Sequence, residues 1–180
     1  MPRTPTARQN SRNTLPATKR VFLSLGSNLG DRLSQIRNGL MLLSDAGVKV
    51  LRVSSLYRTE PVDLRSQPWF INCVAKVETK LSPRKLLRLL KSTERALGRR
   101  QETPKGPRPI DIDILLYENV VGSSRALTIP HARMTERRFV LVPLREIAPG
   151  LMHPAERKTI SALLRETADV SKVVKLGKEL

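Results

Sequence analysis

The clearest alternation of apolar and polar positions lies at residues 70–78. Every second position there carries a small or apolar side chain, namely Ile71, Cys73, Ala75 and Val77. Successive side chains of a strand point to opposite faces, so this pattern predicts a strand with one face in the core. Cys73 belongs to the core-facing set and is interpreted as a small buried residue, not as a nucleophile.

The other face of this predicted strand begins with Phe70 and Asn72. An aromatic ring next to an amide can stack on a flat heterocycle and hydrogen-bond to it. Taken alone, the stretch favours a half-buried phenylalanine beside an exposed asparagine. The ligand-binding interpretation remains the alternative.

Two segments repeat apolar residues with the period of a helix. The first follows Asp31, a typical N-cap, and ends at Gly47. Its apolar stripe consists of Leu33, Ile36, Leu40 and Leu43. The second occupies 82–98 and begins with Ser82 and Pro83, which together are a strong helix start. Both segments predict amphipathic helices that cover a sheet.

Glu94 interrupts the apolar stripe of the second helix. The stripe consists of Leu86, Leu87, Leu90 and Leu97. A carboxylate at that place needs a partner or lies at the wall of a cleft. A position at the edge of the surface is an equally good interpretation.

Apolar runs at 21–25 and 48–57 predict two further strands, and a proline-punctuated loop at 59–68 precedes the strand at 70–78. The next apolar run, at 110–116, is a strand that contains two acids. With short helical pieces after it, the order of elements predicts an α+β sandwich.

The two acids of that run have no structural purpose in a buried strand. Its core face is predicted to carry Ile110, Ile112, Ile114 and Leu116. Asp111 and Asp113 then share the opposite face, about 6.6 Å apart along the strand. Carboxylates so placed can hold one or two Mg²⁺ ions, and without a cation their charges repel. Two solvent-facing acids on an amphipathic strand are the simpler alternative.

Composition narrows the class of protein. A chain of 180 residues with one cysteine predicts one domain without a disulfide framework, in the cytoplasm. No apolar run is long enough to span a bilayer, so no membrane partner is expected. The net charge of +17 suits nucleic acid or a polyphosphate, but aromatic residues are only 3% and do not interleave with basic ones. We therefore expect no nucleic-acid partner.

Residues 1–19 are predicted to form a disordered basic tail in front of a single domain at 20–180. The tail is rich in Pro, Thr, Arg and Asn and has no apolar segment of the kind found in secretory signals. A transit peptide shares this bias, although Pro2, Pro5 and Pro16 disfavour an amphipathic helix there. A targeting role is the alternative for this segment.

The motif KGPRPIDIDIL at 105–115 resembles the signature of the 6-hydroxymethyl-7,8-dihydropterin pyrophosphokinase family. Further matches follow in the family's order: SLGSNLGDR (24–32), SSLYRTEPV (54–62), QPWFINCV (67–74) and IPHARMTERRFVLVPLREIAP (129–149). The resemblance implies a ferredoxin-like antiparallel sheet with helices packed on it, an α/β/α sandwich. A monomer is expected.

The resemblance also implies an activity in folate biosynthesis. An enzyme of this family moves pyrophosphate from ATP to 6-hydroxymethyl-7,8-dihydropterin and releases AMP, with two Mg²⁺ ions as cofactors. The hydroxyl proton would pass to Asp113 or to water. The residues alone leave two alternatives, a metal-dependent phosphohydrolase that uses the same aspartates and a basic RNA-binding module.

Each matched motif carries residues with an implied role. The implied catalytic set, with the two aspartates as the Mg²⁺ ligands, is Arg99, Arg108, Asp111 and Asp113. The implied ATP-binding set is Glu94, Ile114, Thr128, His131 and Arg137. The implied pterin-binding set, with two phenylalanines around the ring, is Thr59, Val62, Phe70, Asn72 and Phe139.

Four positions depart from the family pattern. Lys105 stands where Trp is common, and Gln101 where Arg is frequent. Ala132 and Thr135 replace a usual Pro and His. The first two departures put in doubt how the cationic segment 99–108, expected to be a mobile lid, closes over ATP.

Overall fold

The protein is described by a computed structural model over residues 17–100 and 106–177. Most of the predicted tail, and Gln101 and Lys105 of the predicted lid, lie outside the described residues, so both predictions remain untested. The first strand begins at Lys19, one residue before the predicted start of the domain. In the described part, no helix is long and apolar enough to cross a membrane.

The described residues form one main sheet in which every neighbouring pair of strands is antiparallel. The strands lie in the order β5-β1-β4-β3-β8, and β2 also pairs with β4. Their bounds are β1 Lys19–Ser27, β2 Lys49–Val53, β3 Leu56–Thr59, β4 Phe70–Thr79, β5 Asp111–Tyr117 and β8 Val173–Gly177. A small separate sheet pairs β6 Gly122–Ser123 with β7 Thr128–Ile129.

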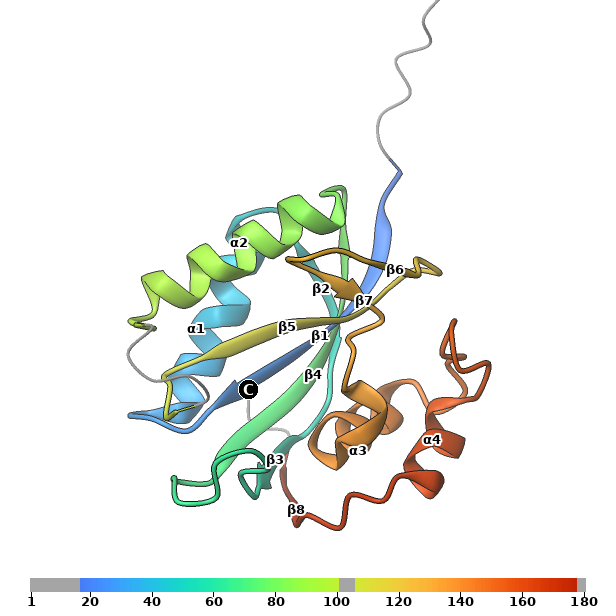
Figure 1. Ribbon diagram of the computed structural model, residues 1–180. Coiled ribbons are helices and arrows are strands. Elements are labelled where there is room, and N and C mark those ends of the chain that lie inside the picture. The colour runs from blue at the N-terminus through green and yellow to red at the C-terminus, as the bar shows by residue number, and fades with distance from the viewer. Residues whose placement is uncertain (1–16, 101–105, 178–180) are drawn as a thin grey trace, which may run out of the picture.

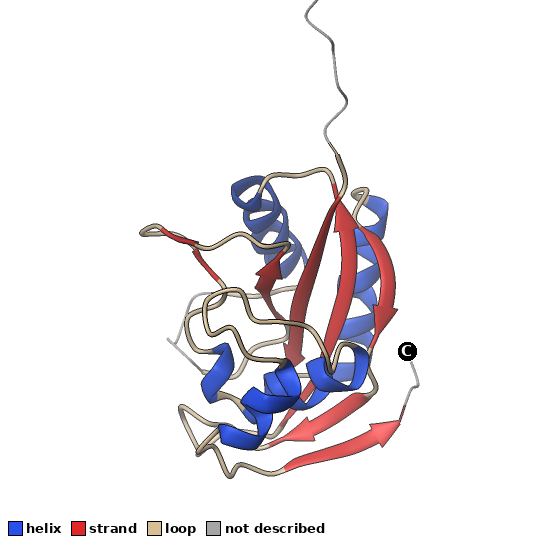
Figure 2. Cartoon of the chain, turned by 90° about the vertical axis from the view of Figure 1, so that its right-hand side faces the viewer, coloured by secondary structure: helices blue, strands red, loops and turns tan. Residues whose placement is uncertain are grey.

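Helices cover both faces of the main sheet. They are α1 Arg32–Asp45, α2 Pro83–Ala96, α3 Arg138–Ile147 and α4 Ile160–Glu166, with a short 3₁₀ helix at Met134–Glu136. Figure 1 shows α1 and α2 on one side of the sheet and α3 and α4 on the other, and Figure 2 shows the same layers after a quarter turn. Two apolar cores fill the two interfaces. The predicted ferredoxin-like α/β/α sandwich is confirmed.

Strand β4 is buried on both faces over its first six residues. Cys73 lies in the α1/α2 core as predicted, and burial raises the pKa of its thiol to about 12. The simpler prediction for the other face is wrong, because Asn72 is only 4% exposed. The Asn72 amide is hydrogen-bonded to Thr59 of β3 and lies against Gly26 of β1, so its side chain is buried between neighbouring strands.

The predicted strand at 48–57 is two strands separated by Ser54 and Ser55. The Ser54 Oγ accepts a hydrogen bond from the Val74 amide at 3.0 Å, and this contact fills the gap between β2 and β3. Both strands pair with β4 in the antiparallel sense, one after the other along it.

Leu116 was predicted to share a core with Ile110, Ile112 and Ile114, but it packs in the core on the opposite face of the sheet. The pairing of β1 with β5 shifts register between Phe22 and Leu23, which leaves one extra residue, Leu115, on β5. Such a bulge turns the following side chains to the opposite face. Ile110, Ile112 and Ile114 therefore pack in the α1/α2 core as predicted, whereas Leu116 packs under α3.

Candidate active site

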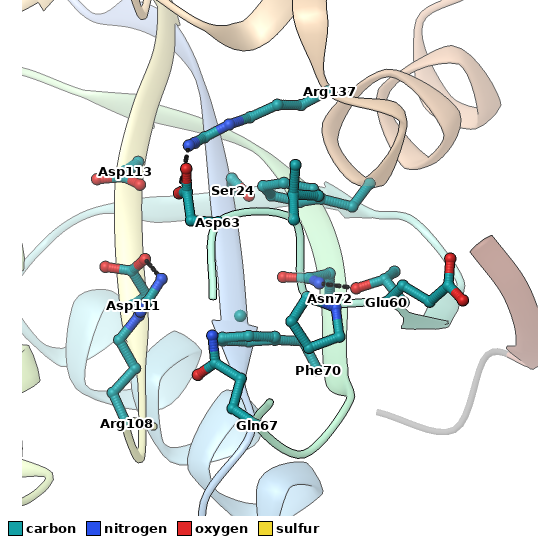
Figure 3. Close-up of a pocket in the computed structure, with 15 residues that line it drawn as sticks. Ser24, Glu60, Asp63, Gln67, Phe70, Asn72, Arg108, Asp111, Asp113 and Arg137 are labelled. Carbon is teal, nitrogen blue, oxygen red and sulfur yellow. Dashed lines mark hydrogen bonds and ion pairs between the residues drawn. The ribbon is translucent and has the colours of Figure 1, made fainter. Parts of the chain in front are cut away.

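A pocket lies where the ends of β1, β4 and β5 meet the loop after β3. Nine of the residues with an implied role line it, namely Thr59, Val62, Phe70, Asn72, Arg108, Asp111, Asp113, Arg137 and Phe139. Figure 3 shows Asp111 and Asp113 one above the other along β5, across the pocket from Phe70 and Asn72 of β4. The charged and the aromatic residues thus face one common space.

Asp111 is fully paired with cations. Its Oδ1 accepts a short hydrogen bond from Arg99, and its Oδ2 lies 2.8 Å from Arg108 Nη2. Burial raises the pKa of this carboxyl, but Arg108 and Arg99 outweigh burial and hold it below its ordinary value. The predicted repulsion between the aspartates is therefore already offset at Asp111 without a metal ion.

Asp113 has a weaker partner. Lys91 Nζ lies 3.9 Å from its Oδ1, beyond hydrogen-bonding distance. Burial, and then the charge of Asp111, raise the pKa of Asp113 above its ordinary value. Of the two carboxylates, Asp113 is the one whose negative charge most lacks compensation.

Glu94 is buried and bonded to three groups. Of the two interpretations of this residue, the one that requires a partner is confirmed, and the position at the edge of the surface is wrong. One oxygen, Oε1, receives the Ile112 amide at 2.7 Å, Lys91 Nζ at 2.9 Å and Arg99 Nη1 at 2.7 Å. Burial nevertheless raises the pKa of this carboxyl. Glu94 thus anchors the residue between the two aspartates and also holds one cation beside each of them.

Lys91 was not singled out from the sequence. It lies three residues before Glu94 on α2, a spacing that brings side chains together on a helix. This spacing predicts a contact between Lys91 and Glu94. It does not show whether the lysine faces β5 or solvent.

A second group of opposite charges includes Asp63 and Arg137 of the same pocket. Arg137 and Arg133 both bind Asp63, each at 3.1 Å, and Arg137 also lies over the Phe139 ring at 5.4 Å. Asp63 is another residue that sequence reasoning missed. His131 is tied to β5 through its amide, which donates to the Leu115 carbonyl at 2.9 Å. Burial lowers the pKa of the His131 imidazole, although Asp113 opposes this.

The aromatic side of the pocket is held by hydrogen bonds between strands. Asn72 Nδ2 donates to Thr59 Oγ1 at 2.7 Å. A side chain on Gly26 would meet the Asn72 Oδ1 at 2.3 Å, so it would displace the Asn72 amide. The Arg108 guanidinium lies 5.0 Å from the centre of the Phe70 ring and links the aromatic side to Asp111.

Four residues of the implied ATP-binding set do not line the pocket, namely Glu94, Ile114, Thr128 and His131. Ile114 packs in the α1/α2 core because it alternates with Asp113 along β5. Thr128 lies on β7, where its hydroxyl is 3.0 Å from the hydroxyl of Ser123. Glu94, Arg99 and His131 do not line the pocket, but all three contact β5 directly.

The aspartate pair fits a magnesium ion that shares its ligands with a substrate. Mg²⁺ prefers oxygen ligands and is held by one or two carboxylates together with phosphate oxygens and water. Within 17–100 and 106–177, no three or more His, Cys, Asp or Glu residues gather as an all-protein metal site. The weakly compensated charge of Asp113 gives a cation a favourable place.

This fold and this pocket define a class of protein. A ferredoxin-like sandwich presents carboxylates and guanidinium groups beside an aromatic and amide wall, an arrangement that suits a polyphosphate next to a flat ring. The sequence profile of 7,8-dihydro-6-hydroxymethylpterin-pyrophosphokinase (HPPK) matches residues 22–149, and the chain belongs to this family.

Several curated relatives are similar over most of the chain. The folic acid synthesis protein fol1 of Schizosaccharomyces pombe is 45% identical over 87% of this chain, which spans only 22% of that protein. The chain likewise spans about a fifth of the fol1 protein of Pneumocystis carinii. The 2-amino-4-hydroxy-6-hydroxymethyldihydropteridine pyrophosphokinase of Methylorubrum extorquens is 44% identical, over 74% of this chain and 85% of that protein.

Solved structures share the fold. A crystal structure of Plasmodium falciparum HPPK-DHPS superposes with a TM-score of 0.68 over 86% of this chain and 46% of that chain. The sequence identity is 17%, so this likeness supports the fold alone.

Proposed function

We propose that this chain transfers pyrophosphate from ATP to 6-hydroxymethyl-7,8-dihydropterin and releases AMP, as a step of folate biosynthesis. The observation that carries the proposal is that one pocket joins the aspartate pair to the Phe70 and Phe139 side chains. Membership of the HPPK family and the name of the bacterial relative support it.

In the proposed reaction, the hydroxymethyl oxygen of the pterin attacks the β-phosphorus of ATP. The bond between that phosphorus and the oxygen that bridges it to the α-phosphorus breaks, and AMP leaves with this oxygen. The hydroxyl proton passes to Asp113 or to water. Such a transfer needs alignment and neutralised charge more than a strong base.

Different residues of the site would bind the two substrates. Phe70 and Phe139 would hold the pterin ring, while the hydrogen bond from Asn72 to Thr59 fixes the amide that faces the edge of the ring. Arg108 contacts both sides of the pocket, so its guanidinium is placed to bind phosphate oxygens close to the ring. Glu94 would act on ATP through Lys91 and Arg99, which it orients.

Asp111 and Asp113 would hold the Mg²⁺ cofactor, with two ions as our expectation. When bound, Mg²⁺ neutralises phosphate charge and orients the phosphates for in-line transfer. We further propose that the protein works as a monomer in the cytoplasm, without nucleic acid. Aromatic residues are only 3% and do not interleave with basic ones, which supports the absence of a nucleic-acid partner.

The experiment that tests the function is incubation with ATP, Mg²⁺ and 6-hydroxymethyl-7,8-dihydropterin, followed by separation of the nucleotides. We expect AMP to form only when the pterin is present, together with the pterin diphosphate. Release of inorganic phosphate without pterin would instead identify a phosphohydrolase. Steeply salt-dependent binding of RNA without AMP formation would identify an RNA-binding module.

A further inference from the structure

Glu146, near the end of α3, accepts hydrogen bonds from the segment between β2 and β3 and from β3 itself. Its Oε2 accepts hydrogen bonds from the Ser55 amide at 3.0 Å and the Tyr57 hydroxyl at 2.7 Å. Its Oε1 accepts from the Ser55 hydroxyl at 2.8 Å. Burial raises the pKa of this carboxyl, but the hydrogen bonds from Tyr57 and Ser55 outweigh it and lower the pKa. Glu146 is therefore a well-bonded carboxylate outside the active site.

The segment that Glu146 holds leads directly into the pterin side of the pocket. Tyr57 is paired with Asn72, and Thr59 with Phe70, in the β3–β4 ladder. Thr59 lines the pocket and accepts the hydrogen bond from Asn72. A shift of Ser55 and Tyr57 would therefore move the strand that supports the Phe70 wall.

The helix that carries Glu146 also carries the opposite wall. Phe139 is the second residue of α3 and lines the pocket. Glu146 follows it by seven residues, which is two helical turns, so both side chains lie on the same face about 10 Å apart. One end of α3 thus reaches the pocket while the other is bonded to β3.

We propose that Glu146 is a positioning residue that sets the separation between the two aromatic walls of the pterin pocket. Its carboxylate fixes α3 against β3, and thereby fixes Phe139 against Phe70. The inference rests on the proposed function, because the ligand of this pocket is taken to be the pterin.

Apolar packing alone does not fix this geometry. α3 packs on the sheet through Val140, Leu141 and Leu144, which are buried at 2% exposure or less. Hydrophobic contact is non-directional, so it holds the helix on the sheet without selecting one position along it. The hydrogen bonds that Glu146 accepts from Ser55 and Tyr57 are directional and select that position, and Lys175 Nζ adds a longer contact at 3.5 Å.

The test measures binding of 6-hydroxymethyl-7,8-dihydropterin, by its fluorescence, in the presence of a non-hydrolysable ATP analogue. In Glu146→Leu we expect the pterin Kd to rise roughly tenfold, as the loss of charge-assisted hydrogen bonds predicts, while the Kd of the ATP analogue changes less than twofold. Glu146→Gln should recover most of the affinity, since an amide oxygen can accept from Tyr57 and its NH₂ can donate to the Ser55 hydroxyl. The matched control is Arg145→Leu, an exposed neighbour on the same helix, which should leave both Kd values unchanged.

A pterin Kd that stays at the wild-type value in a folded Glu146→Leu would overturn the inference. If that variant fails to fold, Tyr57→Phe and Ser55→Ala each remove part of the same contact, and unchanged pterin binding in both would overturn it equally. Equal losses for pterin and for the ATP analogue would also overturn it, because they indicate general destabilisation. Failure of the wild-type protein to bind pterin at all would instead refute the proposed function.

Discussion

The two halves of the pocket are held together by different kinds of contact. On the half proposed to bind pterin, the pterin side, Asn72 bonds to Thr59 across two strands, and Glu146 bonds to Tyr57 behind that half. On the half proposed to bind the phosphates, the phosphate side, groups of opposite charge form ion pairs. Asp111 takes two arginines, and Asp63 takes two more.

This difference indicates which half must rearrange. The hydrogen bonds of the pterin side can persist when a ring enters, so that side is preorganised. On the phosphate side, Arg99 and Arg108 must share or leave Asp111 before they can bind phosphate oxygens. We expect substitutions on the phosphate side to act mainly on the chemical step, and those on the pterin side to act mainly on affinity.

The largest effect is expected from the aspartates. Asp113→Ala, and separately Asp111→Ala, should lower kcat on the order of 10³-fold, because neither carboxylate can be replaced in holding a cation at the phosphates. The measurement is AMP formation at saturating ATP and pterin. Asp45→Ala, at an exposed acid at the end of α1, is the matched control and should retain normal turnover. Near-normal rates in either active-site variant would refute the metal assignment.

Arg108 tests whether one residue serves both halves. Arg108→Ala should lower the single-turnover rate on the order of 10²-fold with far less effect on the Kd of an ATP analogue. The pterin KM should rise by a smaller factor, since the contact with the Phe70 ring is lost. Arg108→Lys should recover only part of the rate, because an ammonium lacks the planar fork of a guanidinium.

Two outcomes would contradict this role of Arg108. A loss of ATP-analogue binding with an unchanged chemical step would make it a ground-state anchor for the nucleotide. An unchanged pterin KM would show that its contact with Phe70 contributes nothing to the aromatic side. Arg95→Ala, at an exposed position on α2, should change neither quantity.

Gly26 tests the pterin side alone. Gly26→Ala should raise the pterin Kd on the order of tenfold, because the new methyl group displaces the Asn72 amide. The Kd of an ATP analogue should stay within about twofold. Gly39→Ala is the control, since the nearest atoms to its added carbon lie at 3.7 Å and alanine favours a helix by about 0.5–1 kcal/mol. An equal rise in both Kd values for Gly26→Ala would contradict a separate pterin side.

Local patterns predicted the elements, but not what covers them. The alternation at 70–78 identified β4, yet Asn72 is buried against Thr59 of β3 and Gly26 of β1, contacts that no local pattern shows. The bulge at Leu115 is invisible in a continuous apolar run, so Leu116 was assigned to the wrong core. Lys91 and Asp63 have the types and positions of ordinary surface charges, and only the tertiary contacts show their partners. Strand β8 was not predicted, because its residues lie outside every matched motif.

The smallest effect is expected on the free energy of unfolding, where substitutions of the two aspartates should act in opposite directions. The pKa of Asp111 is lowered in the folded state, so its charge contributes stability above the ordinary value of 3.8 and loses it only below that pH. Asp111→Asn should therefore lower the free energy of unfolding at pH 7 by about 1–3 kcal/mol, since it leaves Arg99 and Arg108 without their carboxylate. The pKa of Asp113 is raised, so its charge costs stability increasingly as pH rises above 3.8. Asp113→Asn should stabilise the protein at pH 7 and less so at pH 5, as measured by urea unfolding. If both variants changed stability in the same direction, the arginines would not be compensating Asp111 selectively.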